Sequence, residues 1–227
     1  MRSSMPAVGH AVYLHGFASS PASSKAQRFA RELAARGVGM SCPDFNQPDF
    51  ETLTVTRMLD QTADAVAAAP VGPVALIGSS LGAFVAIHSA RQDARSPQPR
   101  VDRLVLLAPG LDFGGNRLRQ LGEHGIEEWR RAGRLRVFHF AFNEPRDVSF
   151  ALYEDAARYD AFAVAMDVPT LVFQGTRDAI VDPDLVKRWA APRSNVDLRL
   201  VDDEHQLAAS MDEIWRASAA MFGLDAR

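Results

Sequence analysis

Five residues, Gly78-Ser79-Ser80-Leu81-Gly82, form a G-x-S-x-G pentapeptide directly after the apolar run 74–77. This pattern is typical of a nucleophile elbow, a sharp turn from a buried strand into a helix that holds a reactive serine in a strained backbone conformation. Glycine is needed on both sides because a side chain there would clash where the strand and the helix close together. The pattern predicts Ser80 as a nucleophile, with Gly78 and Gly82 as the elbow glycines.

A second turn, His15-Gly16-Phe17, follows the short apolar strand expected over residues 10–14. When a serine attacks a carbonyl carbon, the oxygen becomes negative and needs hydrogen-bond donors held ready for it. We predict that the backbone N–H groups of Phe17 and Leu81 are these oxyanion donors, with Gly16 as the turn glycine.

A reactive serine also needs a base, and the base needs an acid that orients it. Asp178 follows the apolar strand expected over residues 170–174, and His205 follows the last expected strand, 196–201. The sequence therefore predicts that His205 takes the proton from Ser80 and that Asp178 holds His205 in the right tautomer.

Other carboxylates are alternatives to Asp178. Asp182 precedes a proline at the start of an expected helix, which favours a helix N-cap. Asp112 follows the fourth expected strand, where an acid could also stand, and Asp202 and Asp203 lie close to the histidine in sequence.

Four further histidines compete with His205. His88 lies within a nearly all-apolar helix and is expected to be a hydrogen-bonded core residue, whereas His15 is expected to support the oxyanion turn. His124 and His139 fall in the segment after the fourth strand, where surface or packing roles are favoured over contact with substrate. No pair of histidines has the spacing of metal ligands, so we expect neither a metal nor another cofactor.

Two segments carry a family resemblance: Y-L-H-G-F-A-S-S-P-A-S-S-K at residues 13–25 and G-S-S-L-G-A at residues 78–83. They resemble the small bacterial esterases of the YqiA-like branch of the α/β-hydrolase superfamily. The resemblance runs from the first strand to the final helix, but only these two segments are specific to the branch. Ala83 stands where the branch often has a second glycine, and this departure removes no catalytic group.

Strand and helix patterns alternate along the chain, which predicts parallel βαβ units. Six strands are expected, over residues 10–14, 38–42, 74–77, 104–108, 170–174 and 196–201. The predicted fold class is α/β: an α/β-hydrolase fold with a mostly parallel six-stranded sheet, helices on both faces and a single domain spanning residues 1–227. Because the oxyanion turn comes so early, the usual first two antiparallel strands are expected to be missing.

Residues 112–161 form too long an interval for a bare loop and predict a small helical cap, inserted after the fourth strand and broken at Gly122 and Gly125. Its basic residues could attract an anionic acyl carrier, or could pair with acidic neighbours, as Glu127 could with Arg131. These basic residues are Arg117, Arg119, Arg130, Arg131, Arg134 and Arg136, against Glu123, Glu127 and Glu128. Its large apolar residues could line an acyl pocket or form a core for the cap: Trp129, Phe138, Phe140, Phe142 and Phe150.

The composition narrows the class of protein. A net charge of −3 with mixed signs argues against nucleic-acid binding, and the single Cys42 excludes an internal disulfide and favours a reducing compartment. The N-terminus lacks the apolar core of a signal peptide, and no later apolar run is long enough to cross a membrane. We expect a cytoplasmic protein that acts on a small-molecule ester or thioester and binds neither nucleic acid nor membrane.

Together these features predict a serine hydrolase that cleaves carboxylic esters through an acyl-enzyme, with Ser80, His205 and Asp178 as its triad. Two alternatives stay open. An acyl-CoA thioesterase would use the same residues, because the triad does not fix the leaving group. A non-catalytic ligand-binding protein could use the same fold.

Overall fold

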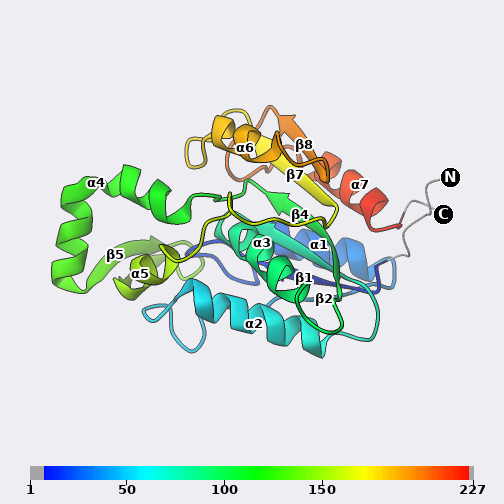
Figure 1. The fold of residues 1–227 in the computed structure, drawn as a ribbon, viewed down its shortest axis with the longest axis horizontal. Coiled ribbons are helices and arrows are strands. Elements are labelled where there is room, and N and C mark those ends of the chain that lie inside the picture. The colour runs from blue at the N-terminus through cyan, green and yellow to red at the C-terminus, as the bar shows by residue number, and fades with distance from the viewer. Residues whose placement is uncertain (1–7, 225–227) are drawn as a thin grey trace.

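The computed structural model describes residues 8–224, except for the side chains of residues 114–120. Its centre is a six-stranded parallel sheet with the strand order β2-β1-β3-β4-β7-β8 (Figure 1). These strands are β1 (His10–Leu14), β2 (Gly39–Ser41), β3 (Val74–Ser79), β4 (Val101–Leu107), β7 (Thr170–Gly175) and β8 (Val196–Val201). The predicted fold class and the six expected strands are confirmed.

Helices cover both faces of the sheet. The core on one face includes α2 (Val55–Ala68), α3 (Leu81–Asp93) and α6 (Pro183–Ala190), and the core on the other includes α1 (Ser24–Ala34) and α7 (Met211–Met221). Successive strand residues point to opposite faces, so in β1 Val12 and Leu14 enter the first core, whereas Ala11 and Tyr13 enter the second. Because both faces are covered, β1 and β3 are apolar almost throughout.

The segment between β4 and β7 extends beyond one end of the sheet (Figure 1). It contains α4 (Phe113–Ala132), an antiparallel hairpin of β5 (Arg134–His139) and β6 (Glu144–Ser149), and α5 (Ala151–Ala156). The expectation of helices alone was therefore wrong. Leu135 and Val137 alternate with arginines, and this period of two places both apolar side chains against the core, which favours a strand.

The glycines of this cap behave differently from each other. Gly122 kinks α4, with φ 65° and ψ 172°, a conformation that glycine adopts without a side-chain clash. Gly125 continues the helix, so the predicted break there was wrong.

A small aromatic core stabilises the cap. Trp129 and Phe150 are buried and meet edge to face, with ring centroids 5.5 Å apart. The indole N–H of Trp129 also donates to the carbonyl of Val148, 3.2 Å away. Of the predicted cap aromatics, these two pack within the protein, whereas Phe138, Phe140 and Phe142 are exposed. Among the described residues, no helix is both long enough and apolar enough to span a membrane.

Candidate active site

The predicted site residues meet at the carboxyl edge of the sheet. Ser80 follows β3, the His15-Gly16-Phe17 turn follows β1, Asp178 follows β7 and His205 follows β8. In parallel sheets a crevice forms at this edge where the strand order reverses, which here is between β1 and β3. The fold thus brings together residues that lie up to 190 positions apart in the chain (15 to 205).

Ser80 has a strained backbone, with φ 54° and ψ −115°, as expected of a nucleophile elbow. Hydrogen bonds on both sides hold this conformation. The Ser80 N–H donates to the carbonyl of Leu107 at 2.9 Å, and the Ser80 carbonyl accepts from the N–H groups of Ala83 at 3.0 Å and Gly110 at 3.1 Å. The strain is therefore fixed by β4 and α3 together.

The elbow glycines leave no room for a side chain. A Cβ on Gly78 would lie 2.5 Å from Cα of Ala83, and one on Gly82 would lie 2.0 Å from the carbonyl oxygen of Leu14. Both obstacles are backbone, which cannot rotate away. A Cβ on Gly16 would lie 3.2 Å from the carbonyl oxygen of Ser79, a closer approach than most Cβ atoms make.

A chain of contacts joins the predicted nucleophile, base and acid. Nε2 of His205 lies 3.2 Å from Oγ of Ser80, and Nδ1 of His205 lies 2.9 Å from Oδ2 of Asp178. If Nδ1 carries the proton and donates a hydrogen bond to the carboxylate, Nε2 is free to accept the proton of the serine. This is the geometry that a Ser-His-Asp triad requires.

Asp178 has a buried side chain and is well supplied with donors. Its Oδ1 accepts from the backbone N–H groups of Ile180 and Val181, and its Oδ2 accepts from Nε2 of Gln174 as well as from His205. Burial acts to raise the pKa of Asp178, but these hydrogen bonds, with His205 foremost, lower it overall. The lowered pKa keeps the carboxyl group ionised beside Nδ1 of His205.

Gln174 is a residue that the sequence reasoning missed. It is fully buried at the end of β7, and it donates to Asp178 at 2.9 Å. A signal was present, because a single amide at the carboxyl end of the apolar strand T-L-V-F-Q needs a polar partner once it is buried.

Two sets of hydrogen bonds hold the loop that carries His205. The Asp203 carboxylate accepts from the backbone N–H of Glu204 and from both the N–H and the hydroxyl of Ser210. From α1, Nζ of Lys25 donates to the backbone carbonyl and the side-chain oxygen of Gln206, at 3.0 and 3.2 Å. Burial lowers the pKa of Lys25 to about 8, against the opposing pull of nearby carboxylates.

The alternative acids have other contacts. Asp182 caps α6 by accepting from the N–H of Asp184, as expected from the proline that follows it. Asp202 forms an ion pair with Arg177. Because the two ring nitrogens of His205 contact Ser80 and Asp178, neither is left for Asp112.

His15 supports the turn that carries the predicted oxyanion donor Phe17. Nδ1 of His15 lies 2.9 Å from the carbonyl oxygen of Gly16, and Nε2 lies 3.0 Å from the backbone N of Phe45. The carbonyl can only accept and the amide can only donate, so a proton on Nδ1 satisfies both of these contacts. Asp44 lies beside this ring, with Oδ1 3.5 Å from Nε2, and the neighbouring His15 together with hydrogen bonds from Asn46 lowers the pKa of Asp44 to about 2.

His124 and His88, two of the other candidate bases, contact other residues. His124 is exposed and pairs with Glu128. His88 is buried against the rings of Phe84 and Tyr159, and burial lowers its pKa to about 4. The expectation that His88 is fully hydrogen-bonded was wrong, because within the described part of the protein its Nε2 has no hydrogen-bond partner.

A cavity of about 580 Å³ opens above Ser80. Its wall includes Phe17 and Leu81, which carry the predicted oxyanion donors, and Phe140 from the cap. Apart from His205, the lining residues among those the structure describes carry no acidic or basic side chain: Gly16, Phe17, Ala18, Ser19, Ser20, Ala22, Ser23, Ser80, Leu81, Gly110, Phe113, Phe140, Ala141, Ile180, Val181 and Gln206.

None of the predicted basic cap residues that the structure describes, which are Arg130, Arg131, Arg134 and Arg136, is among the residues that line this cavity. Glu127 pairs with Arg130 rather than with Arg131, so the predicted i,i+4 pair was wrong in its partner. Arg134 lies 3.8 Å from Asp147 on the neighbouring strand. Arg117 and Arg119 fall among the side chains that the structure does not describe. Over the described residues, no group of three or more His, Cys, Asp or Glu side chains is placed to hold a metal ion.

Comparison with known protein families gives one match. Residues 10–221 match the uncharacterised protein family UPF0227. The chain belongs to this family. The match covers every strand of the central sheet and all four turns that meet at the site. A comparison with curated proteins found no match.

Solved structures share the fold. A protein from Agrobacterium vitis S4 superposes with a TM-score of 0.84 at 24% identity, over 96% of this chain and 91% of that one. The alpha/beta hydrolase domain-containing protein 10 from mouse superposes with a TM-score of 0.77 at 18% identity, over 95% and 90%. A monoacylglycerol lipase from Paleococcus ferrophilus gives 0.70 at 16% identity, over 94% and 93%. These similarities establish the α/β-hydrolase fold.

Proposed function

We propose that this protein is a serine hydrolase that cleaves neutral carboxylic esters through an acyl-enzyme. The proposal rests above all on the contacts of His205, 3.2 Å from Oγ of Ser80 and 2.9 Å from Oδ2 of Asp178. These three residues form one hydrogen-bonded chain, and two of them, Ser80 and His205, line the cavity. A protein that only binds a ligand has no need of such a chain, so its presence argues against the non-catalytic alternative.

In the first half-reaction, His205 takes the hydroxyl proton of Ser80 while Oγ attacks the ester carbonyl carbon. The carbonyl oxygen becomes negative and is bound by the backbone N–H groups of Phe17 and Leu81. Each such donor contributes about 3–4 kcal/mol to transition-state stabilisation in comparable enzymes. The intermediate then collapses, the bond to the alcohol oxygen breaks, and the alcohol leaves with the proton from His205.

In the second half-reaction, water attacks the acyl carbon of the acyl-enzyme while His205 takes a proton from it. The bond to Oγ of Ser80 then breaks, and His205 returns the proton to Ser80. The carboxylic acid is released. Asp178 stays ionised throughout and stabilises the imidazolium that forms in both halves.

The cavity lining supports a neutral substrate. Apolar side chains such as Phe113, Phe140 and Val181 suit an acyl group, and the hydroxyls of Ser19 and Ser23 suit the polar part of an alcohol. An acyl-CoA thioester would place several negative charges near the mouth of the cavity, where the described lining offers no lysine or arginine. A monoacylglycerol lipase and the protein Est1E from Butyrivibrio proteoclasticus share the fold, which is compatible with ester hydrolysis.

The test is an assay of the purified protein on p-nitrophenyl esters from acetyl to palmitoyl, beside acyl-CoA thioesters with the same acyl groups. We expect hydrolysis of the neutral esters, with at least about 10³-fold loss of kcat in Ser80→Ala. Preferred turnover of acyl-CoA, weakening steeply with salt, would favour the thioesterase instead. No turnover of either class by the wild-type protein would refute the proposal.

A further inference from the structure

The tip of the β5–β6 hairpin contains a buried polar residue among exposed aromatics. The side chains of Phe138, Phe140 and Phe142 are 48%, 76% and 45% exposed, whereas His139 has no exposed surface. A buried histidine costs free energy unless both ring nitrogens have partners. The partners of His139 therefore indicate what holds the tip of the hairpin in place.

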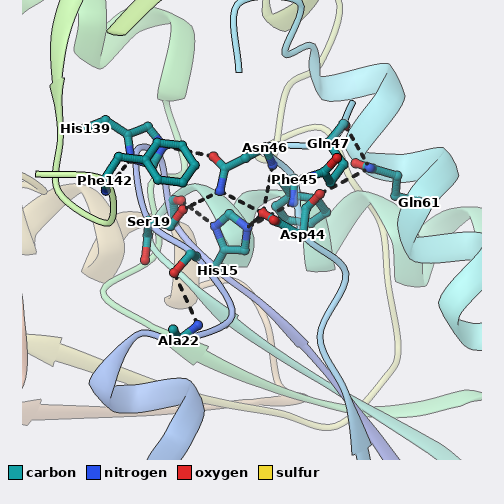
Figure 2. A network of polar contacts seen from close by, with 12 residues as sticks. His15, Ser19, Ala22, Asp44, Phe45, Asn46, Gln47, Gln61, His139 and Phe142 are labelled. Carbon is teal, nitrogen blue, oxygen red and sulfur yellow. Dashed lines mark hydrogen bonds and ion pairs between the residues drawn. The ribbon is translucent and has the colours of Figure 1, made fainter. Parts of the chain in front are cut away.

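Asn46, in the loop after β2, is one partner of His139 (Figure 2). Nδ2 of Asn46 donates to the carbonyl of Ser19 at 2.9 Å and to Oδ1 of Asp44 at 2.7 Å. The amide oxygen of Asn46 is then left as an acceptor, so Nε2–H of His139 donates to it, at 2.9 Å. Asn46 is itself 5% exposed, so water hardly competes for these bonds.

The other side of His139 holds the hairpin turn. Nδ1 of His139 accepts from the backbone N–H of Phe142 at 3.3 Å, and the two rings stack with centroids 4.2 Å apart. The rings of His139 and Phe50 are also nearly perpendicular, with centroids 4.6 Å apart. Both nitrogens are thus used, one within the hairpin and one across to the core of the protein.

These bonds join two walls of the cavity above Ser80. Phe140 and Ala141 line it from the hairpin, and Ala18 and Ser19 line it from the loop after the oxyanion turn. Asn46 bridges the two by binding Ser19 and His139. A direct bond from the Ala141 N–H to the Ala18 carbonyl, at 3.4 Å, is long and would hold the walls only weakly.

We propose that Asn46 and His139 form a latch that holds the Phe140 wall against the oxyanion-side loop and so determines which acyl groups the cavity accepts. Both are positioning residues, because neither is among the residues that line the cavity. The inference rests on the proposed ester hydrolysis at Ser80. With the latch closed, the Phe140 ring offers an apolar surface to acyl groups that reach beyond the reacting carbonyl.

The test compares octanoyl and acetyl p-nitrophenyl esters. Each methylene buried against an apolar wall contributes about 0.8 kcal/mol, or roughly fourfold in affinity, so losing contact with two or three methylenes costs at least tenfold. In His139→Ala we expect the octanoyl-to-acetyl ratio of kcat/KM to fall at least tenfold, with the loss in KM for the octanoyl ester. His139→Gln should restore most of the ratio, since its amide can donate to Asn46.

Thr56→Val, on α2, is a matched control because Thr56 holds a different part of the cap. Oγ1 of Thr56 bonds to Asp155 and to the hydroxyl of Tyr159, each at 2.6 Å, and so ties the segment after β6 to α2 without touching the cavity. This variant should lower the melting temperature and leave the ratio unchanged. An unchanged ratio in His139→Ala, or an equal fall in Thr56→Val, would overturn the latch.

Phe140→Ala covers the case in which His139→Ala fails to fold. Because the Phe140 side chain is exposed, its removal should leave stability nearly unchanged while lowering the same ratio. An unchanged ratio in this variant would also overturn the inference. Failure of the proposed function is distinguishable, because the wild-type protein would then hydrolyse neither ester.

Discussion

Gly82→Ala tests how tightly the elbow is built against β1. An added Cβ would lie 2.0 Å from the carbonyl oxygen of Leu14, 2.5 Å from its carbonyl carbon and 2.7 Å from the carbonyl oxygen of His15. Restoring even 3.0 Å to the nearest atom requires α3 and β1 to part by about 1 Å. Overpacking of this kind costs about 1–3 kcal/mol, and the backbone obstacles here point to the upper end.

For a protein of this length, about 3 kcal/mol corresponds to a fall of roughly 6–12 °C in melting temperature. We expect a larger effect on the catalytic rate than the loss of stability alone would produce. A shift of about 1 Å between Ser80 and the turn that carries Phe17 is enough to cost roughly 10²-fold in rate. Thermal unfolding and kcat on a p-nitrophenyl ester measure the two effects separately.

Gly110→Ala is the matched control, because Gly110 also lies against Ser80. The atoms nearest to its added Cβ belong to the backbone of Ser80 and Leu81 and would lie 3.5–3.7 Å away, which is ordinary van der Waals contact. We expect a change in stability within about 1 kcal/mol. A Gly82→Ala protein as stable and active as Gly110→Ala would refute the packing argument.

Three further predictions concern ionisable groups. Asp178→Asn should lower kcat on the order of 10⁴-fold because an amide presents the wrong hydrogen-bonding partner to His205. Asp182→Ala should instead lower stability by about 1 kcal/mol through the lost helix cap. If the two outcomes were swapped, Asp182 would be the acid. The pKa of Asp44, about 2, lies below that of an unfolded aspartate, so its contribution is present above about pH 4 and is lost as the pH falls through 2. Between pH 4 and pH 2 the free energy of unfolding should therefore fall by about 1 kcal/mol less in Asp44→Asn than in the wild-type protein, after allowance for solvent screening. Equal falls in the two proteins would contradict this. Burial lowers the pKa of Lys25 to about 8, so between pH 8 and 10.5 the unfolded chain binds more protons than the folded protein does. In this range the free energy of unfolding of the wild-type protein should rise with pH relative to that of Lys25→Met. The same pH dependence in both proteins would contradict this.

The sequence predicted the fold and the positions of the site residues because their signals are local. Each expected strand ends directly before a turn that carries a polar or glycine residue, and parallel strands bring such ends to one edge. The contacts among Ser80, Asp178 and His205 agree with the roles predicted for them, although the roles themselves stay predictions.

What the sequence reasoning missed depends on contacts between distant segments. The hairpin was missed because residues 112–161 were predicted to be helical throughout, although the alternation at Leu135 and Val137 favours a strand. The bond between Asn46 and His139 joins residues 93 positions apart, and neither residue stands in a recognisable motif. The expected hydrogen bonding of His88 failed because burial of the ring did not supply a partner for Nε2.

The central claim is that Ser80 is the nucleophile. Incubating the protein with a fluorophosphonate probe, followed by mass spectrometry of its peptides, tests this most directly, because only a serine activated by a neighbouring base reacts readily. We predict a single labelled residue, Ser80, and no labelling of a Ser80→Ala variant that melts at the wild-type temperature. Labelling at another residue, or ester hydrolysis retained by that variant, would contradict the claim.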